Sequence, residues 1–292
     1  MATLAEWVEG ARPRTLPAAI APVVAGSAVA WFEQSFSLPL AGLALVVSLA
    51  LQIGVNFAND YSDGIRGTDS VRVGPLRLVG SGVADPRHVR AAAFACFGVA
   101  AVAGLAIVII TGHWWLLAVG AVAIAAAWFY TGGRRPYGYL GLGELFVFVF
   151  FGLVAVGGTV YIQVGQVSAS AWWTAIAIGA LACAILVANN LRDLDGDRAA
   201  GKLTMATRLG DSGTRRLFVG LLGVAAVGVF GVAATSSWWA LLGWFMLLAL
   251  IGPIREMIRG VSGRALIPVL KQTGLAELAC AAGLFVGLVI AH

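Results

Sequence analysis

The chain has 292 residues, of which 60% are hydrophobic and 11% are charged. A soluble domain carries about 25% charged residues, so this composition excludes an ordinary soluble protein and predicts an integral membrane protein. The net charge of +5 is better explained by membrane topology and anionic ligands than by nucleic acid, which is not an expected partner.

Nine apolar runs follow one another along the chain, and each is long enough to cross a bilayer as a helix, which needs roughly 20 residues. The runs are rich in Ala, Leu, Val and Gly and lack the alternation of a β-barrel strand, so helices are the expected spanning structure. We therefore predict a single all-α domain over residues 1–292, with nine transmembrane helices around a central cavity. The expected spans are 16–33, 38–58, 88–111, 113–131, 143–163, 171–191, 216–235, 238–257 and 273–291.

Basic residues occupy alternate connections between these runs. All 19 Lys and Arg residues lie in the N-terminal segment, in the connections after the second, fourth, sixth and eighth runs, or at the run ends that adjoin these connections. Positive residues are enriched on the cytoplasmic side of membrane proteins. The pattern therefore predicts a cytoplasmic N-terminus, and it assigns the Asp-rich segments described below to the cytoplasmic side.

The segment before the first run contains ARPRTLP, in which Arg12 and Arg14 flank Pro13. The preceding residues Thr3–Gly10 are expected to form a short helix at the membrane interface. Two interpretations of the arginines are open: a positive anchor at the membrane surface or, for Arg12, a contact with an anionic substrate.

The second run ends in the polar stretch NFANDYSDGIRGTD, residues 56–69. On a helix, Asn56, Asp60 and Asp63 are spaced by four and then three residues, and they therefore share one face. Carboxylates one turn apart at the end of a membrane helix are suited to a divalent cation with oxygen ligands. The stretch thus predicts half of a metal site.

The connection from Asp60 to Asp85 is the longest in the chain and holds five glycines. Long connections in compact proteins are usually functional or disordered, glycines let a backbone approach a ligand closely, and arginines bind phosphate oxygens through paired hydrogen bonds. We favour a cap over a phosphate group, formed with Arg66, Arg72 and Arg77. A plain solvated loop is the alternative.

The fourth run ends in WFYTGGRRPYGYLGLGE, which combines aromatic and basic residues. Tyr and Arg also serve as anchors at membrane interfaces. Their number within ten residues, on the same side as both acidic stretches, favours a substrate site over an anchor. The candidates are Tyr130, Arg134, Arg135, Tyr137 and Tyr139.

The sixth run ends in NNLRDLDGD, a second Asn/Asp pattern. Asn189, Asp193 and Asp197 are spaced by four residues each, and basic residues that include Lys202 follow. The similarity to the first stretch suggests an internal repeat that relates the first four predicted helices to the next four. Equivalent ends of such a pair face each other across one cavity, so the two stretches are predicted to be facing halves of one site.

Carboxylates without nearby His or Cys indicate a hard cation. Mg²⁺ binds one or two carboxylates and completes its shell with phosphate oxygens and water. Because the rest of the chain within reach is apolar, the expected substrate has a diphosphate head and a hydrocarbon tail in the membrane lipid. Loss of the diphosphate from an allylic chain yields a carbocation, which tyrosine faces stabilise. A transporter is the alternative from another class, although its ionisable groups usually lie near the membrane midplane.

The motifs NDYSD (Asn59–Asp63) and DLDGD (Asp193–Asp197), with the Tyr/Arg segment between them, resemble the UbiA superfamily of intramembrane prenyltransferases over the whole chain. RPRTLPAA, GPLR, RPYGYLGLGE and NNLRDLDGDRAAGK are similar to its menaquinone branch, the 1,4-dihydroxy-2-naphthoate polyprenyltransferases. The resemblance implies a Mg²⁺-dependent enzyme of the bacterial cell membrane. Such an enzyme transfers a polyprenyl chain from polyprenyl diphosphate to 1,4-dihydroxy-2-naphthoate, with loss of CO2 and diphosphate, to give demethylmenaquinone.

The motifs and the resemblance together define the expected site. Gly67 and Gly201 stand where the superfamily often has a further Asp, which leaves Asp69 as an outer metal candidate. The expected metal and catalytic residues are Asp60, Asp63, Asp193, Asp197, Tyr130 and Tyr137. The expected substrate contacts are Arg12, Asn56, Asn59, Arg66, Arg72, Arg77, Arg134, Arg135, Tyr139, Asn189, Asn190 and Lys202.

The acceptor is the open part of this prediction. A 4-hydroxybenzoate, haem, chlorophyllide or sugar-phosphate acceptor would use the same metal site. An acceptor carboxylate calls for an arginine, and Arg12, Arg134 and Arg135 are equally suitable at this stage.

Overall fold

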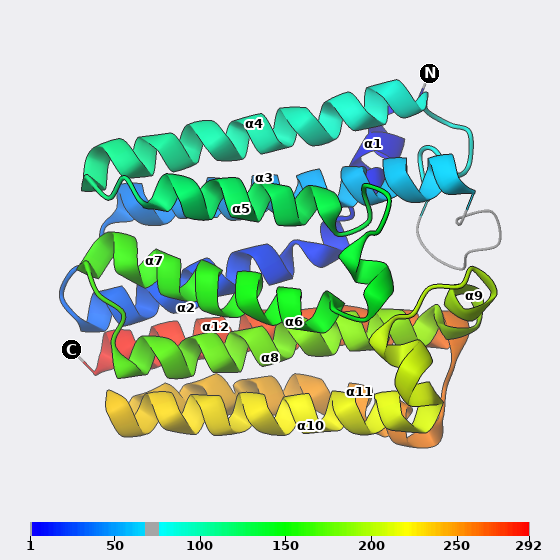
Figure 1. Cartoon of the computed structure of the whole chain (residues 1–292). Helices are drawn as coiled ribbons and strands as arrows, with labels where there is room; N and C mark the ends of the chain where they lie inside the picture. The colour runs from blue at the N-terminus through cyan, green and yellow to red at the C-terminus, as the bar shows by residue number, and fades with distance from the viewer. Residues whose placement is uncertain (1, 68–75, 292) are drawn as a thin grey trace.

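The computed structural model describes residues 2–67 and 76–291, and every regular element in these ranges is helical (Figure 1). The prediction of an all-α protein is therefore confirmed. The long helices are α2 (Pro17–Phe32), α3 (Leu38–Arg66), α4 (Pro86–Thr111), α5 (Leu116–Phe129), α7 (Ala155–Val164), α8 (Ala169–Arg192), α10 (Met205–Thr235), α11 (Met246–Arg259) and α12 (Ile267–Ile290). The short ones are α1 (Leu4–Gly10), η1 (Pro13–Thr15), η2 (Tyr137–Leu140), α6 (Gly143–Val147), the π-helical η3 (Phe148–Val154), α9 (Leu194–Ala199), η4 (Trp238–Phe245) and η5 (Gly263–Leu266).

Seven helices in the described ranges are long and apolar enough to cross a membrane. The segment Leu4–Thr15 together with α2 adds an eighth if this pair, bent by 49°, counts as one span. The helix in the predicted fourth span, α5, has only 14 residues, so the count of nine remains a prediction. The largest extensions beyond the predicted apolar runs are in three helices: α3 continues to Arg66, α10 begins at Met205 and α12 begins at Ile267.

The long helices lie side by side along a common direction (Figure 1). The most buried of the candidate spans is α8, which packs against α10, α12 and η3. It forms the largest apolar core together with α2, α7, α10, α11 and α12. On the other side, α3 packs against α4 and α5, and a smaller apolar core joins α3 to α4. The molecule thus has two helical groups with a boundary between them.

The functional segments gather at one end of the bundle, at the right of Figure 1. Both α3 and α8 end there, and α9 and the connection after α5 lie at the same end. Since α3 and α8 carry the two Asn/Asp stretches, the fold brings both to one end of the molecule.

The contact between α12 and η4 requires a small residue. A Cβ atom at Gly287 would lie 2.1 Å from the carbonyl oxygen of Trp239, and a backbone atom cannot give way as a flexible side chain does. We expect Gly287→Ala to lower the free energy of unfolding by about 1–3 kcal/mol, the usual cost of overpacking. The measurement is the Tm of the detergent-solubilised protein.

Gly98→Ala is the matched control for this substitution. Gly98 lies on the exposed face of α4, where a Cβ would meet no atom within 4 Å in the described structure. Its replacement should leave Tm unchanged or slightly higher, because alanine favours a helix more than glycine does. An equal loss of Tm in both variants would contradict the importance of the α12–η4 approach.

Candidate active site

A cavity of about 620 Å³ lies at the boundary between the α3–α4–α5 group and the α8 core. Its wall is polar where α3 and α8 end. Deeper in the bundle the wall is apolar, with Gly104 and Leu105 from α4, Leu116 from α5 and Ile162 from α7. The cavity therefore combines a charged head region with a hydrocarbon-lined chamber.

The first Asn/Asp stretch is divided between this cavity and the chain that follows α3. Asn56 and Asp63 line the cavity, whereas Asp60 is not among the described residues that do so. The Asp60 carboxylate accepts hydrogen bonds from the backbone N–H groups of Leu78, at 2.7 Å, and Val79, at 3.1 Å. This carboxylate thus holds the returning chain against the helix end.

We expect Asp60→Asn to loosen the segment at Leu78 and Val79, which the Asp60 carboxylate holds against α3. An asparagine has one acceptor oxygen in place of two, and its NH2 group would face a backbone donor. Hydrogen bonds to a charged group contribute about 1.5–3 kcal/mol, so trypsin should cleave the bond after the buried Arg77 at least about 10-fold faster in native protein. Asp195→Asn is the control, because Asp195 is fully exposed, and it should leave the cleavage rate unchanged. Equal rates in Asp60→Asn and the wild type would show that the loop does not depend on this carboxylate.

The second Asn/Asp stretch lies where α8 gives way to α9. The helix is interrupted at Asp193, which caps α8 before α9 begins at Leu194. The Arg192 guanidinium binds the Asp193 carboxylate through two hydrogen bonds, Nε to Oδ1 at 2.8 Å and Nη2 to Oδ2 at 2.7 Å. Asp197 follows one turn later, and both acids line the cavity together with Asn189.

Lys202 connects the two stretches. Its Nζ lies 3.8 Å from Oδ1 of Asp63 and 3.8 Å from Oδ1 of Asp197. Arg77 approaches the same acid of α3, with Nη2 3.6 Å from Oδ2 of Asp63. Carboxylates from α3 and α9 therefore face each other across one charged region.

Tyr139 completes this charged region. Its hydroxyl donates a hydrogen bond to Asp63. The Lys202 ammonium lies 4.6 Å from the centroid of the Tyr139 ring and the Arg66 guanidinium 5.6 Å from it, both within cation–π range. Arg66 also donates to two backbone carbonyls of the connection after α5. It thus binds this connection rather than the cavity.

Tyr130 and Tyr137 form an aromatic part of the cavity wall. Their ring centroids are 5.5 Å apart, and Tyr137 stacks on Phe146 at 4.0 Å. The Tyr137 hydroxyl donates to the carbonyl of Ala126 at 2.8 Å. Burial raises the pKa of Tyr137 well above its ordinary value, so this phenol is neutral at physiological pH.

The predicted arginines occupy different environments. Arg134 and Arg135 are exposed and are not among the described residues that line the cavity. By contrast, Arg12 and Arg77 belong to its wall. Arg72 and the outer acid Asp69 lie outside the described residues.

Arg12 belongs to a polar network that ties the N-terminal segment to α3. Its backbone is left-handed, with φ of 56°, and its carbonyl accepts from the Thr15 hydroxyl at 2.9 Å. That hydroxyl accepts in turn from the side-chain amides of Gln52, at 2.9 Å, and Asn56, at 3.0 Å. Nη2 of Arg12 and Oε1 of Gln52 are buried and have no hydrogen-bond partner in the described part of the chain. Within the described ranges, an unpaired donor and an unpaired acceptor thus belong to two residues of the same wall.

Sequence reasoning missed several of these polar residues. Gln52 precedes Asn56 by four residues, so extending the helical register one turn deeper would have identified it. Nothing in the local sequence indicates the two pairs made across the fold. In these, Thr131 donates to Asn59 at 2.7 Å, and Asn190 donates to Glu144 at 2.9 Å.

The charged region fits a hard divalent cation on the chemistry of its donors. Among residues 2–67 and 76–291, no three His, Cys, Asp or Glu side chains are grouped closely enough to hold a metal ion. Mg²⁺ does not need such a group, because it binds one or two carboxylates and takes its remaining ligands from phosphate and water. Asp63 and Asp197 match this requirement, because both carboxylates lie 3.8 Å from the same ammonium group, that of Lys202.

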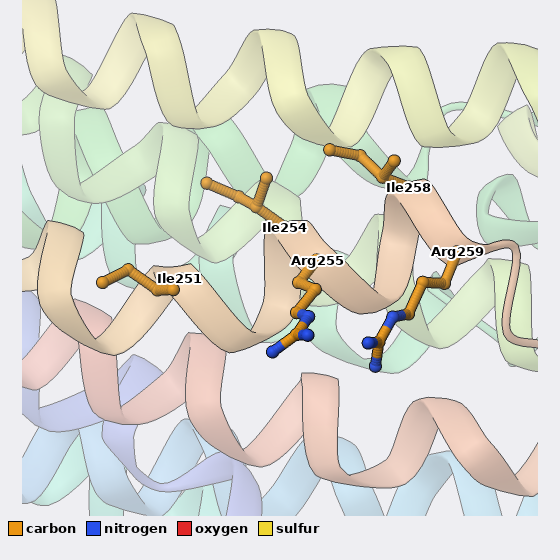
Figure 2. Close-up of a pocket in the computed structure, with 5 residues that line it drawn as sticks. All are labelled: Ile251, Ile254, Arg255, Ile258 and Arg259. Atoms are coloured by element: carbon orange, nitrogen blue, oxygen red, sulfur yellow. The ribbon is translucent and has the colours of Figure 1, made fainter.

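A second hollow lies on α11 and is lined by Ile251, Ile254, Arg255, Ile258 and Arg259 (Figure 2). Among the described residues, none lines both this hollow and the main cavity. Arg259 donates to Glu256 at 3.1 Å on the same helix. With isoleucines beside exposed arginines, this hollow is typical of a helix face at a membrane interface, and we assign it no part in the reaction.

The fold and the cavity define a class of protein: a multi-pass helical membrane protein with a charged site at one end of a cavity that is apolar at the other. The chain belongs to the UbiA prenyltransferase family, whose characteristic sequence pattern it matches over residues 19–265.

Curated relatives match nearly the whole chain. A 1,4-dihydroxy-2-naphthoate octaprenyltransferase of Mycobacterium tuberculosis is 55% identical over 95% of this chain and 94% of its own. The protein of the same name in Escherichia coli is 38% identical over 91% of this chain and 89% of its own. Both proteins carry the name implied by the motifs in the menaquinone branch.

Solved structures share the fold at low sequence identity. A UbiA homolog from Aeropyrum pernix K1 in its apo form matches with a TM-score of 0.71 at 17% identity, over 96% of this chain and 98% of that one. A UbiA homolog from Archaeoglobus fulgidus bound to GPP and Mg²⁺ matches with a TM-score of 0.62 at 16% identity, over 97% and 99% of the two chains. The helical architecture is therefore that of the family.

Proposed function

We propose that this protein transfers a polyprenyl chain from an allylic polyprenyl diphosphate to 1,4-dihydroxy-2-naphthoate, with loss of CO2 and diphosphate. The observation that carries the proposal is the division of one cavity into a charged head region and an apolar chamber. Such a cavity suits an amphiphile with an anionic head and a hydrocarbon tail. The names of the curated relatives support the same reaction.

The diphosphate head belongs, in this proposal, beside Asp63, Asp197, Arg77 and Lys202. When bound, Mg²⁺ would neutralise the charge that grows on the departing diphosphate. Asp63 and Asp197 would hold the metal, and the two cationic side chains would bind the remaining phosphate oxygens. Asp60 contacts the chain at Leu78 and Val79, and we propose that it positions the site through them. Its role as a metal ligand, like that of Asp193, stays a prediction.

The chain transfer itself exchanges one bond for another. The bond between the allylic carbon and the diphosphate oxygen breaks, and the oxygen keeps the electron pair. In this proposal the resulting cation lies beside the cavity-lining residues Tyr130 and Tyr137, whose aromatic rings would stabilise positive charge. It forms a carbon–carbon bond with the ring carbon of the acceptor that bears the carboxylate. CO2 then leaves, its bonding electrons return to the ring, and no proton has to be removed from that carbon.

The acceptor wall, in this proposal, is formed by Arg12 and Gln52. The buried Nη2 of Arg12 is suited to a carboxylate, and the buried Oε1 of Gln52 is suited to a hydroxyl donor. An acceptor that carries a carboxylate next to a hydroxyl group presents both partners. Arg134 and Arg135, the other candidates in the sequence, are exposed and lie outside this wall.

The identity of the product tests this proposal. Purified protein in detergent would receive a polyprenyl diphosphate, Mg²⁺ and either 1,4-dihydroxy-2-naphthoate or 4-hydroxybenzoate, with products identified by mass. We expect a decarboxylated prenyl product from the naphthoate and none from the benzoate. A product from the benzoate alone, or from neither acceptor, would overturn the proposal.

We further propose that the N-terminus and the charged end of the bundle face the cytoplasm. The support is the restriction of basic residues to alternate connections. With nine spans, the C-terminus is then on the opposite side, so a C-terminal alkaline phosphatase fusion should be active in a bacterial host. An inactive phosphatase fusion together with a fluorescent green fluorescent protein fusion would instead support eight spans.

A further inference from the structure

The charged region of the cavity already contains a cation of the protein itself. The Lys202 ammonium lies 3.8 Å from both Asp63 and Asp197, and its side chain is only 10% exposed. This is the region in which the proposed metal–diphosphate head would be held. A bound metal ion and the ammonium would therefore compete for the same carboxylates.

The anchoring of Lys202 permits the ammonium to move while the backbone stays in place. Its N–H donates to the Asp197 carbonyl at 2.8 Å, and its own carbonyl accepts from the Thr207 hydroxyl at 3.1 Å. The preceding Gly201 has φ of 70°, which turns the chain back over α9. The four-carbon stem beyond this anchor is flexible, and the ring of Tyr139 offers a second contact at 4.6 Å.

We propose that Lys202 is the internal counter-ion of the substrate-free site, and that the metal–diphosphate head binds by displacing its ammonium from Asp63 and Asp197. Metal alone binds weakly, because it must replace a positive charge that already pairs with both carboxylates. A diphosphate brings negative charge with the metal and offers the displaced ammonium new oxygen partners. Lys202 thus couples metal binding to diphosphate binding. Between turnovers its ammonium is the cationic partner of both carboxylates. The inference rests on the proposed diphosphate site.

The test measures metal binding without turnover. Mn²⁺, used in place of Mg²⁺, would be titrated into detergent-solubilised protein and followed by electron paramagnetic resonance, with and without geranyl diphosphate and in the absence of any acceptor. In the wild type, geranyl diphosphate should strengthen Mn²⁺ binding strongly. In Lys202→Met, Mn²⁺ should bind at least about 10-fold more tightly without the diphosphate, and the added effect of the diphosphate should shrink.

Three variants serve as controls. Lys202→Gln removes the charge with a polar side chain and should behave like Lys202→Met, which covers the case in which one of them folds poorly. Lys202→Arg keeps the charge and should keep weak binding of metal alone. Lys271→Met changes the only other lysine of the chain, which is exposed and outside the cavity; it alters the net charge equally and should leave Mn²⁺ binding unchanged.

The outcomes separate this inference from the proposed function. Unchanged Mn²⁺ affinity in Lys202→Met and Lys202→Gln, with normal enhancement by geranyl diphosphate, would overturn the counter-ion role and leave the diphosphate site standing. An absence of Mn²⁺ binding in the wild type, even with geranyl diphosphate, would overturn the diphosphate site and the inference together.

Discussion

Asp63→Asn and Asp197→Asn are each expected to reduce prenyl transfer by at least about 100-fold, since each removes a carboxylate proposed to hold the metal. Both acids line the cavity, and both lie at the same distance from Lys202. Replacement by the amide preserves size and polarity but removes the charge that holds a divalent cation. The measurement is the initial rate of transfer at saturating substrates, with the amount of inserted protein determined in the same membranes.

Asp195→Asn is the matched control for these two variants. Asp195 lies between the two acids of the second stretch, yet its side chain is fully exposed and its ion pair with Arg198 is long, at 4.0 Å. Its transfer rate should equal that of the wild type. Wild-type rates in Asp63→Asn or Asp197→Asn, or transfer that persists after EDTA treatment, would contradict the metal assignment.

Arg12→Ala is expected to raise the KM for 1,4-dihydroxy-2-naphthoate by about 10- to 100-fold, the range that corresponds to losing a charged hydrogen bond of about 1.5–3 kcal/mol. The KM for the polyprenyl diphosphate should change much less, because Lys202 and Arg77 lie beside the acids of the metal site and Arg12 belongs to the network of Thr15 and Gln52. Steady-state kinetics with each substrate varied in turn measure both constants.

Arg134→Ala provides the comparison, since Arg134 is exposed and outside the cavity. It should alter neither KM. If Arg12→Ala raised the KM for the diphosphate and left that for the naphthoate unchanged, Arg12 would belong to the diphosphate site and the acceptor wall would have to be sought elsewhere. Arg12→Lys should recover only part of the loss, because an ammonium cannot bind a carboxylate through two parallel hydrogen bonds.

Helix periodicity and hydropathy made much of this protein predictable. Apolar runs long enough to span a bilayer identify α2, α4 and α8 to within a few residues, because burial in lipid leaves few polar residues between helix ends. The Asn/Asp stretches at the ends of two such runs predicted a site at one end of the bundle. The helical register also brings Asn56 and Asp63 to the same cavity.

Other features of the site depend on segments that are distant in sequence. The direction of Asp60 follows from the return of the chain at Leu78 and Val79, and no local pattern encodes that path. The proposal of Arg12 rather than Arg134 for the acceptor rests on the tertiary structure, because Arg12 lines the cavity and Arg134 is exposed at the surface. Arg12 lies next to a proline and precedes an apolar run, and Arg134 lies next to a glycine and follows one. Their local sequences are therefore too similar to show which of them lines the cavity.

Sequence by itself determined the class of protein, the positions of most helices, the family motifs and the kind of ion they suit, because hydropathy and helical spacing act over a few turns of one segment. Only the tertiary structure decided which carboxylates face the cavity, which of them Lys202 bridges and which buried groups of Arg12 and Gln52 have no partner among residues 2–67 and 76–291. The physical reason is that hydrogen bonds and ion pairs between connections depend on how the helices beneath them pack, and packing is a property of the whole chain.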